Sequence, residues 1–118
     1  MRFTALLLTL AGLFGCACGD AKPPAGPADG AALFREQNCI QCHGPDGAGT
    51  NLGPTLHGKK QHWTREKLAT YLANPQSVIQ GDKRLEEQET HFMIKMVPFA
   101  NLTLEQRLAL ADHVLGFP

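Results

Sequence analysis

The clearest pattern of apolar and polar positions lies near the C-terminal end, over residues 103–116. Apolar side chains recur there at helical spacing and would share one face: Leu104, Leu108, Ala111 and Leu115. Thr103 stands before this stretch and Gln106 follows three positions later, which is the sequence of a capping box. We therefore expect an amphipathic helix over residues 103–116 with this face buried.

Other helices are indicated earlier in the chain. Residues 64–73 begin with Thr64 as a candidate N-cap, and their inward side chains would be Leu68, Tyr71 and Leu72. Residues 28–42 form another helical segment, and the charged residues 82–91 are typical of one exposed helix. From residue 44 to 63, glycines and prolines recur too often for a regular element, so we expect a loop. No strand alternation and no internal repeat is present, and the chain is predicted to be all-α.

The N-terminal residues read as a targeting segment. Arg2 precedes an apolar run over residues 5–14 that is too short to span a bilayer and fits a secretory signal. Leu13-Phe14-Gly15-Cys16 then resembles the lipobox of bacterial lipoproteins, which implies cleavage before Cys16 and lipid on its sulfur. Ordinary cleavage near residues 15–17, leaving both Cys16 and Cys18 as thiols, is the alternative.

Three segments follow from this reading: a signal peptide over residues 1–15, a lipid-anchored linker over residues 16–29 and one domain over residues 30–118. The linker is rich in proline and small residues and has no apolar periodicity. We expect an exported protein on the periplasmic side of the cell envelope, tethered to a membrane.

Charge excludes one class of partner. The formal net charge is +0, so nothing indicates nucleic acid binding. The charges are nevertheless uneven, with a basic cluster at Lys59, Lys60, Arg65 and Lys67 and an acidic cluster at Glu86, Glu87 and Glu89. Each cluster is either a solvated face or a docking patch.

The most informative motif is Cys39-Ile40-Gln41-Cys42-His43, the attachment signature of c-type haem. On a helix over residues 36–43, Cys39 and Cys42 would lie a turn apart on one face and could add to the two vinyl groups of one porphyrin. His43 would then reach the iron as an axial ligand. A zinc site would need a second pair of ligands, and a redox pair would need a βαβ context. A chance match is the remaining alternative.

A second axial ligand has few candidates. Apart from the initiator, the methionines are Met93 and Met96. Met96 precedes Pro98, which stiffens the backbone, and lies just before the terminal helix. Met93 has no such neighbour and is more simply explained as a core residue. We expect Met96 to be the sixth ligand, giving Met/His ligation and a raised reduction potential.

These motifs, in this order, resemble the class I cytochrome c family of single-haem electron carriers. The matching residues are Gly30 and Phe34; Gly53-Pro54-Thr55-Leu56; Leu68, Tyr71, Leu72, Asn74 and Pro75; and Met96 with Pro98 and Phe99. The resemblance implies three to five helices around one covalent haem c. It also implies that the Pro54 carbonyl accepts the Nδ1 hydrogen of His43, a contact that orients a ligand and makes it more basic.

One position departs from the family pattern. Where the last helix usually carries an aromatic against the first helix, this chain has His113. We interpret His113 as a helix contact rather than a ligand. The sole tryptophan, Trp63, would lie either near the haem carboxylates or under the middle helix.

The sequence thus predicts a membrane-tethered electron carrier between respiratory redox proteins, without a small-molecule substrate and not an enzyme. The alternatives are a haem subunit, sensor or enzyme with an open sixth coordination site, and a lipoprotein without haem. An optical spectrum separates the three.

Overall fold

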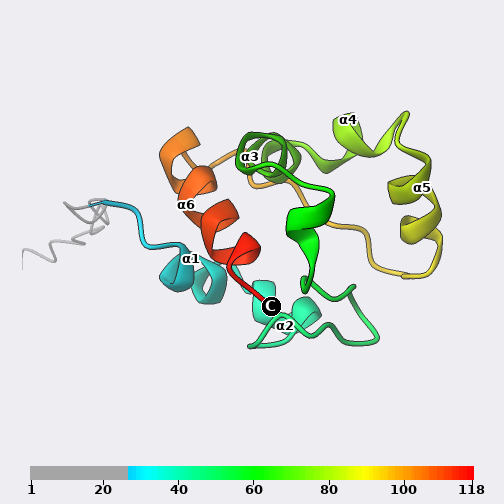
Figure 1. Ribbon diagram of the computed structural model, residues 1–118, viewed down its shortest axis with the longest axis horizontal. Coiled ribbons are helices and arrows are strands. Elements are labelled where there is room, and N and C mark those ends of the chain that lie inside the picture. The colour runs from blue at the N-terminus through cyan, green and yellow to red at the C-terminus, as the bar shows by residue number, and fades with distance from the viewer. Residues whose placement is uncertain (1–26) are drawn as a thin grey trace, which may run out of the picture.

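The computed structural model describes residues 27–118, which fold as short helices joined by long loops (Figure 1). The helices are α1 (Gly30–Glu36), α2 (Cys39–His43), η1 (Lys59–Gln61, a 3-10 turn), α3 (Arg65–Ala73), α4 (Pro75–Ile79), α5 (Lys83–Thr90) and α6 (Leu104–Leu115). No strand occurs between residues 27 and 118, so the all-α prediction is confirmed. The expected signal peptide, Cys16 and most of the linker lie outside the described residues.

Side-chain caps explain where several helices begin. The Asp29 carboxylate accepts hydrogen bonds from the amides of Ala31 and Ala32 at the start of α1. Thr64 caps α3, and Thr103 with Gln106 forms the expected capping box of α6. The helices predicted over residues 64–73 and 103–116 are therefore confirmed to within two residues at each end.

The helix expected over residues 28–42 is wrong as one piece. Gln37 ends α1, and Asn38 has φ 59, in the left-handed region, before α2 begins at Cys39. Asparagine tolerates this conformation better than most residues, so Asn38 can turn the chain without glycine. As a result α2 runs in a new direction from α1, and the two cysteines lie on their own short helix.

The first and last helices are packed side by side (Figure 1). The contact is close because Gly30 has no side chain: a Cβ there would lie 2.1 Å from the carbonyl oxygen of Ala109. Phe34 of α1 is buried beside it, with its ring 5.2 Å from that of His113 and 5.5 Å from that of Phe117. His113 is thus a helix contact, as expected. Phe117 adds a second aromatic ring to this contact, which was not predicted from the sequence.

The buried face of α6 differs from the expected one. Leu104 is 60% exposed, while Leu110, Ala111 and Val114 are buried. The helix packs against both α1 and α3, and it carries apolar residues on more than one face. Ala111 is buried as expected, and Leu115 is half-buried against the core. Spacing alone therefore predicted the helix correctly and its buried face in part, because it did not indicate Leu110 and Val114 and wrongly included Leu104.

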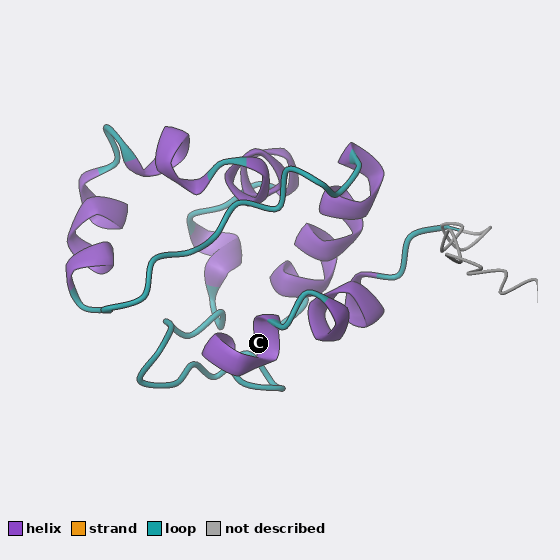
Figure 2. Ribbon diagram, turned by 180° about the vertical axis from the view of Figure 1, so that it is seen from behind, coloured by secondary structure: helices purple, strands orange, loops and turns teal. Residues whose placement is uncertain are grey.

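The helices α4 and α5 form the end of the described structure opposite α1 (Figure 1). From α3 the chain passes through the short helix α4 into α5, and the long loop over residues 91–103 leads back from α5 to α6 (Figure 2). Asn74 ends α3 and caps α4, where Pro75 occupies the first turn. The exposed helix expected over residues 82–91 is α5, capped by Asp82, and it buries one residue, Leu85.

Candidate haem site

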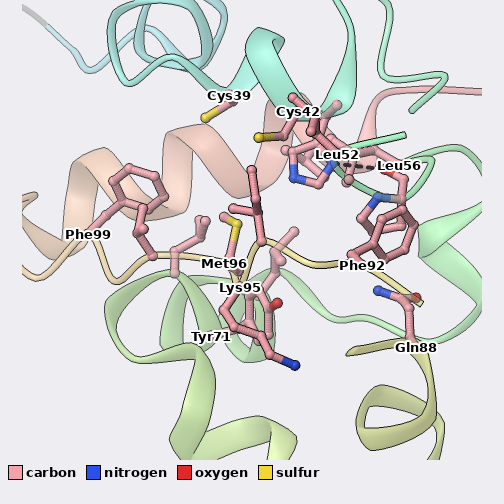
Figure 3. A pocket seen from close by; sticks show the side chains of 18 of the residues that line it. Cys39, Cys42, Leu52, Leu56, Tyr71, Gln88, Phe92, Lys95, Met96 and Phe99 are labelled. Atoms are coloured by element: carbon pink, nitrogen blue, oxygen red, sulfur yellow. Dashed lines mark hydrogen bonds between the residues drawn. The ribbon is translucent and has the colours of Figure 1, made fainter. Parts of the chain in front are cut away.

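A cavity of about 350 Å³ lies between α2 and the segment that precedes α6 (Figure 3). Its wall also includes residues of α3 and α5. Most of the lining side chains are apolar, among them Leu52, Leu56, Leu68, Leu72, Ile79, Phe92, Ile94, Val97 and Phe99. A cavity of this kind favours a largely apolar ligand held by a few placed polar groups.

Both cysteines of the motif line this cavity. Cys39 is buried, Cys42 is half-buried and neither forms a disulfide. Figure 3 shows their sulfur atoms pointing away from α2 toward the side where Met96 lies. Burial, with a smaller contribution from Cys42, raises the pKa of the Cys39 thiol to about 11, so Cys39 is protonated at neutral pH. The two side chains are placed to react with one molecule in the cavity.

His43 is buried at the end of α2, and its ring is oriented by the backbone of a distant loop. Its Nδ1 lies 2.8 Å from the carbonyl oxygen of Pro54. A carbonyl can only accept, so Nδ1 carries the hydrogen and Nε2 has the free lone pair. Burial lowers the pKa of His43, which favours the neutral ring that a metal requires.

The loop that carries Pro54 is fixed by several short contacts. The Thr50 hydroxyl donates to the Cys42 carbonyl at 2.7 Å, and the Leu56 amide donates to the Gly47 carbonyl at 2.7 Å. Gly53 packs on the motif itself, since a Cβ there would lie 3.0 Å from both Cβ and the carbonyl oxygen of Cys42. The glycine therefore lets the loop approach α2 closely enough for Pro54 to meet His43.

The two methionines are placed differently. Met96 is half-buried, packs against the hydrophobic core and lines the cavity. Met93 is 100% exposed and does not line it. The description of Met93 as a core residue is therefore wrong, because the chain between α5 and Met96 runs along the surface. Among residues 27–118, Met96 alone brings a thioether to the cavity that Cys39, Cys42 and His43 share.

Charged and aromatic groups gather at one edge of this cavity. Trp63 packs edge-on against Tyr71 of α3 at 5.1 Å and also lines the cavity. Lys67 lies 5.2 Å and Arg84 5.7 Å from the Trp63 ring. Lys59 belongs to the wall, and burial, followed by the charge of Arg84, lowers its pKa. Part of the basic cluster seen in the sequence thus borders the site.

The acidic cluster behaves differently. Glu86 and Glu87 are exposed, whereas the side chain of Glu89 is 22% exposed and lines the cavity. Its carboxylate accepts a hydrogen bond from Gln76 at 2.8 Å and lies 3.6 Å from Nζ of Lys95. No sequence pattern predicted these contacts, because they depend on how α5 packs against α4.

Tyr71 also belongs to the cavity wall, and it was expected only as an inward residue of α3. Burial, and then the charge of Glu89, raises the pKa of its hydroxyl to about 12. Tyr71 therefore keeps its proton at neutral pH and can act as a hydrogen-bond donor in the cavity that Met96 also lines.

The described part of the chain has neither a cluster of bare-metal ligands nor a membrane-spanning helix. Among residues 27–118, no group of three or more His, Cys, Asp or Glu side chains is arranged to hold a metal ion. The same residues contain no helix long and apolar enough to cross a membrane. The single imidazole and single thioether at one apolar cavity are the donors of an iron porphyrin rather than of a bare ion.

Fold and site together define a single-haem cytochrome built on short helices. The family model described as "Cytochrome c" matches residues 27–117, and the chain belongs to the cytochrome c family. Members of this family bind one covalent haem c and carry electrons, so haem c is the cofactor and electron transfer the class of function.

The curated relatives carry the same name. Cytochrome c 2.1 of Caenorhabditis elegans is 35% identical over 51% of this chain and 72% of its own length. Cytochrome c type-1 of Ascaris suum is 35% identical over 51% and 71%, and cytochrome c of Ulva intestinalis is 33% identical over 52% and 73%. No solved structure matches the chain.

Proposed function

We propose that the protein is a lipid-anchored electron carrier whose haem c is attached at Cys39 and Cys42 and ligated by His43 and Met96. The observation that supports it is the shared cavity: two free thiols, one oriented imidazole and one thioether line it together. Donor set and apolar lining fit a porphyrin with two vinyl groups and a central iron. The bound haem supplies the Fe(III)/Fe(II) couple.

The cysteines make the attachment permanent. Each thiol would add across one vinyl double bond of the haem, its sulfur bonding to one carbon and its hydrogen going to the other. No electron is lost or gained, so the addition needs no oxidant. Because α2 holds Cys39, Cys42 and His43 within one short helix, attachment also fixes the face that His43 presents.

The axial pair sets the chemistry. Nδ1 of His43 is occupied by Pro54, so Nε2 is the atom left for iron. Met96 would supply the second ligand from the same cavity, and an iron ligated by both residues would suit electron transfer and leave no position for small molecules. Thioether ligation and the apolar surroundings both favour the less charged ferrous state, which raises the reduction potential.

The N-terminal segment would keep this carrier near its partners. A diacylated Cys16 holds the chain at a membrane, where one acyl chain alone gives only marginal binding. A linker such as residues 16–29 spans roughly 20 Å as a random coil and about 40 Å when its prolines keep it extended. The domain over residues 30–118 can then reach redox proteins, one donor and one acceptor, at the periplasmic face of the envelope.

An optical spectrum tests the function directly. A low-spin c-type spectrum with the weak near-red sulfur-to-iron band is expected from His43 and Met96 together. A high-spin spectrum would instead support the enzyme or sensor with an open sixth position. A purified chain without a haem spectrum, obtained from cells that mature c-type cytochromes, would contradict any haem function.

A further inference from the structure

Arg107 is a half-buried guanidinium of α6 with an unusual set of partners. It forms no ion pair with any carboxylate among residues 27–118. Its Nε is buried without a hydrogen-bond partner in that part of the chain, while Nη1 donates to the carbonyl oxygen of Leu102. Burying a charged group without a counter-charge is costly. The hydrogen bond to the Leu102 carbonyl offsets part of this cost for the Arg107 guanidinium.

Leu102 continues a line of hydrogen bonds across the molecule. Its amide donates to the carbonyl of Phe99 at 3.1 Å, and the amide of Phe99 donates to the carbonyl of Leu72 at 2.7 Å. Leu72 lies near the end of α3, and Arg107 lies in α6. The segment after Met96 is therefore connected to one helix at Phe99 and to another at Leu102.

These connections are shielded from water. Phe99 and Leu102 are both buried, and Leu72 is buried against them in the same core. A hydrogen bond in such surroundings is not easily exchanged for one to water. Met96 is three residues before Phe99, with Pro98 limiting the backbone freedom between them. The backbone position of Met96 thus depends on where Phe99 and Leu102 are held.

We infer that Arg107 is a positioning residue for Met96: it holds residues 96–102 against α3 and α6 so that the thioether stays at the cavity. This role rests on the proposed function, in which Met96 is the sixth iron ligand. Arginine suits it because the guanidinium stays charged when buried and its donors have a fixed, planar geometry.

The test uses the haem-loaded protein and imidazole, which binds ferric iron only where Met96 leaves. Arg107→Met removes the donors and keeps an apolar stem. We expect imidazole to bind about tenfold more tightly, the size expected for losing one hydrogen bond from a charged donor. The near-red sulfur-to-iron band should weaken, and the amides of Phe99 and Leu102 should exchange with solvent about tenfold faster.

A second variant separates positioning from general stability. Leu115→Ala removes core packing from the last turn of the same helix, away from Leu102. It should lower the unfolding midpoint and leave imidazole affinity unchanged. Equal affinity gains in Leu115→Ala and Arg107→Met would overturn the role of Arg107, and so would unchanged affinity and amide exchange in Arg107→Met.

Two further variants make every result decisive. If Met96→Ala binds imidazole no more tightly than the unmodified protein, Met96 is not the ligand, and the proposed ligation fails together with this inference. If Met96→Ala gains affinity and Arg107→Met does not, only the role of Arg107 fails. Should Arg107→Met not fold, Arg107→Lys replaces it: faster exchange at Leu102 supports the role, and unchanged exchange overturns it.

Discussion

Gly30 of α1 and Ala109 of α6 lie so close that a Cβ on Gly30 would be 2.1 Å from the Ala109 carbonyl oxygen. The obstacle is backbone, so no side chain can move aside to admit even a methyl group. The first and last helices must therefore separate if position 30 carries any side chain, and the core around Phe34 and Leu110 separates with them.

Gly30→Ala should accordingly destabilise the haem-loaded protein by at least about 2 kcal/mol, as overpacking does in a dense core. Denaturant unfolding measures the change. Gly81→Ala is the matched control. A Cβ at Gly81 would meet no atom within 4 Å, so this variant should lose only about 1 kcal/mol, which is what a left-handed φ of +91 costs a residue with a side chain. Equal losses in the two variants would show that the contact with Ala109 is not what matters.

Covalent attachment can be tested on denatured protein. The unmodified chain should keep its haem stain on a denaturing gel, because two thioether bonds survive unfolding. Cys39→Ala or Cys42→Ala should each leave one bond, and the double variant should lose the stain. Release of haem from the unmodified protein by acid-acetone would contradict the attachment.

The methionines give the sharpest pair of variants. Met96→Ala should open the iron, lower the reduction potential, and let cyanide or carbon monoxide bind readily. Met93→Ala should change stability by less than about 0.5 kcal/mol, because the Met93 side chain is fully exposed. Loss of the near-red band in Met93→Ala and its persistence in Met96→Ala would reverse the assignment.

The contact between His43 and Pro54 should tune the iron. Gly53→Ala pushes the loop away from Cys42 and lengthens the hydrogen bond from His43. A less basic imidazole stabilises ferric iron less, so the potential should rise. Gly58→Ala, in an open loop position whose nearest atom is 4.0 Å away, should leave it unchanged. A potential that does not respond to Gly53→Ala would remove Pro54 from this role.

The anchor can be tested by mass. Intact protein should begin at Cys16 and carry the added mass of a diacylglycerol. Cys16→Ser should abolish that mass and release the protein from membranes, whereas Cys18→Ser should change neither. A mature chain that begins elsewhere, or that needs no detergent, would contradict lipidation.

Local chemistry made much of this molecule predictable. Thr64 and Thr103 satisfy amides at helix starts, and this needs only neighbours in the sequence. The haem motif could be recognised for the same reason, because its two cysteines and its histidine lie within five consecutive residues. The direct contact between His43 and Pro54 was expected only through the family resemblance.

Contacts set by tertiary packing were not predictable. The break at Asn38 comes from one backbone angle, and the buried stripe of α6 was decided by its two neighbouring helices. Phe117 meets Phe34 only because the chain turns back after α6, and its ring also fills the space beside Gly47. None of these three features follows from the periodicity of apolar residues, because that periodicity describes a single helix or strand and not its neighbours.

Among the described helices, α5 packs against α4 and no other, although its residues help wall the cavity. Regions with few tertiary contacts open at a lower free energy than the core to which they are attached. We therefore expect the α5 side to open at a lower free energy than the α1–α3–α6 group. Opening on this side would give a large flat cofactor a route into the cavity without separating the helices that form most of the core.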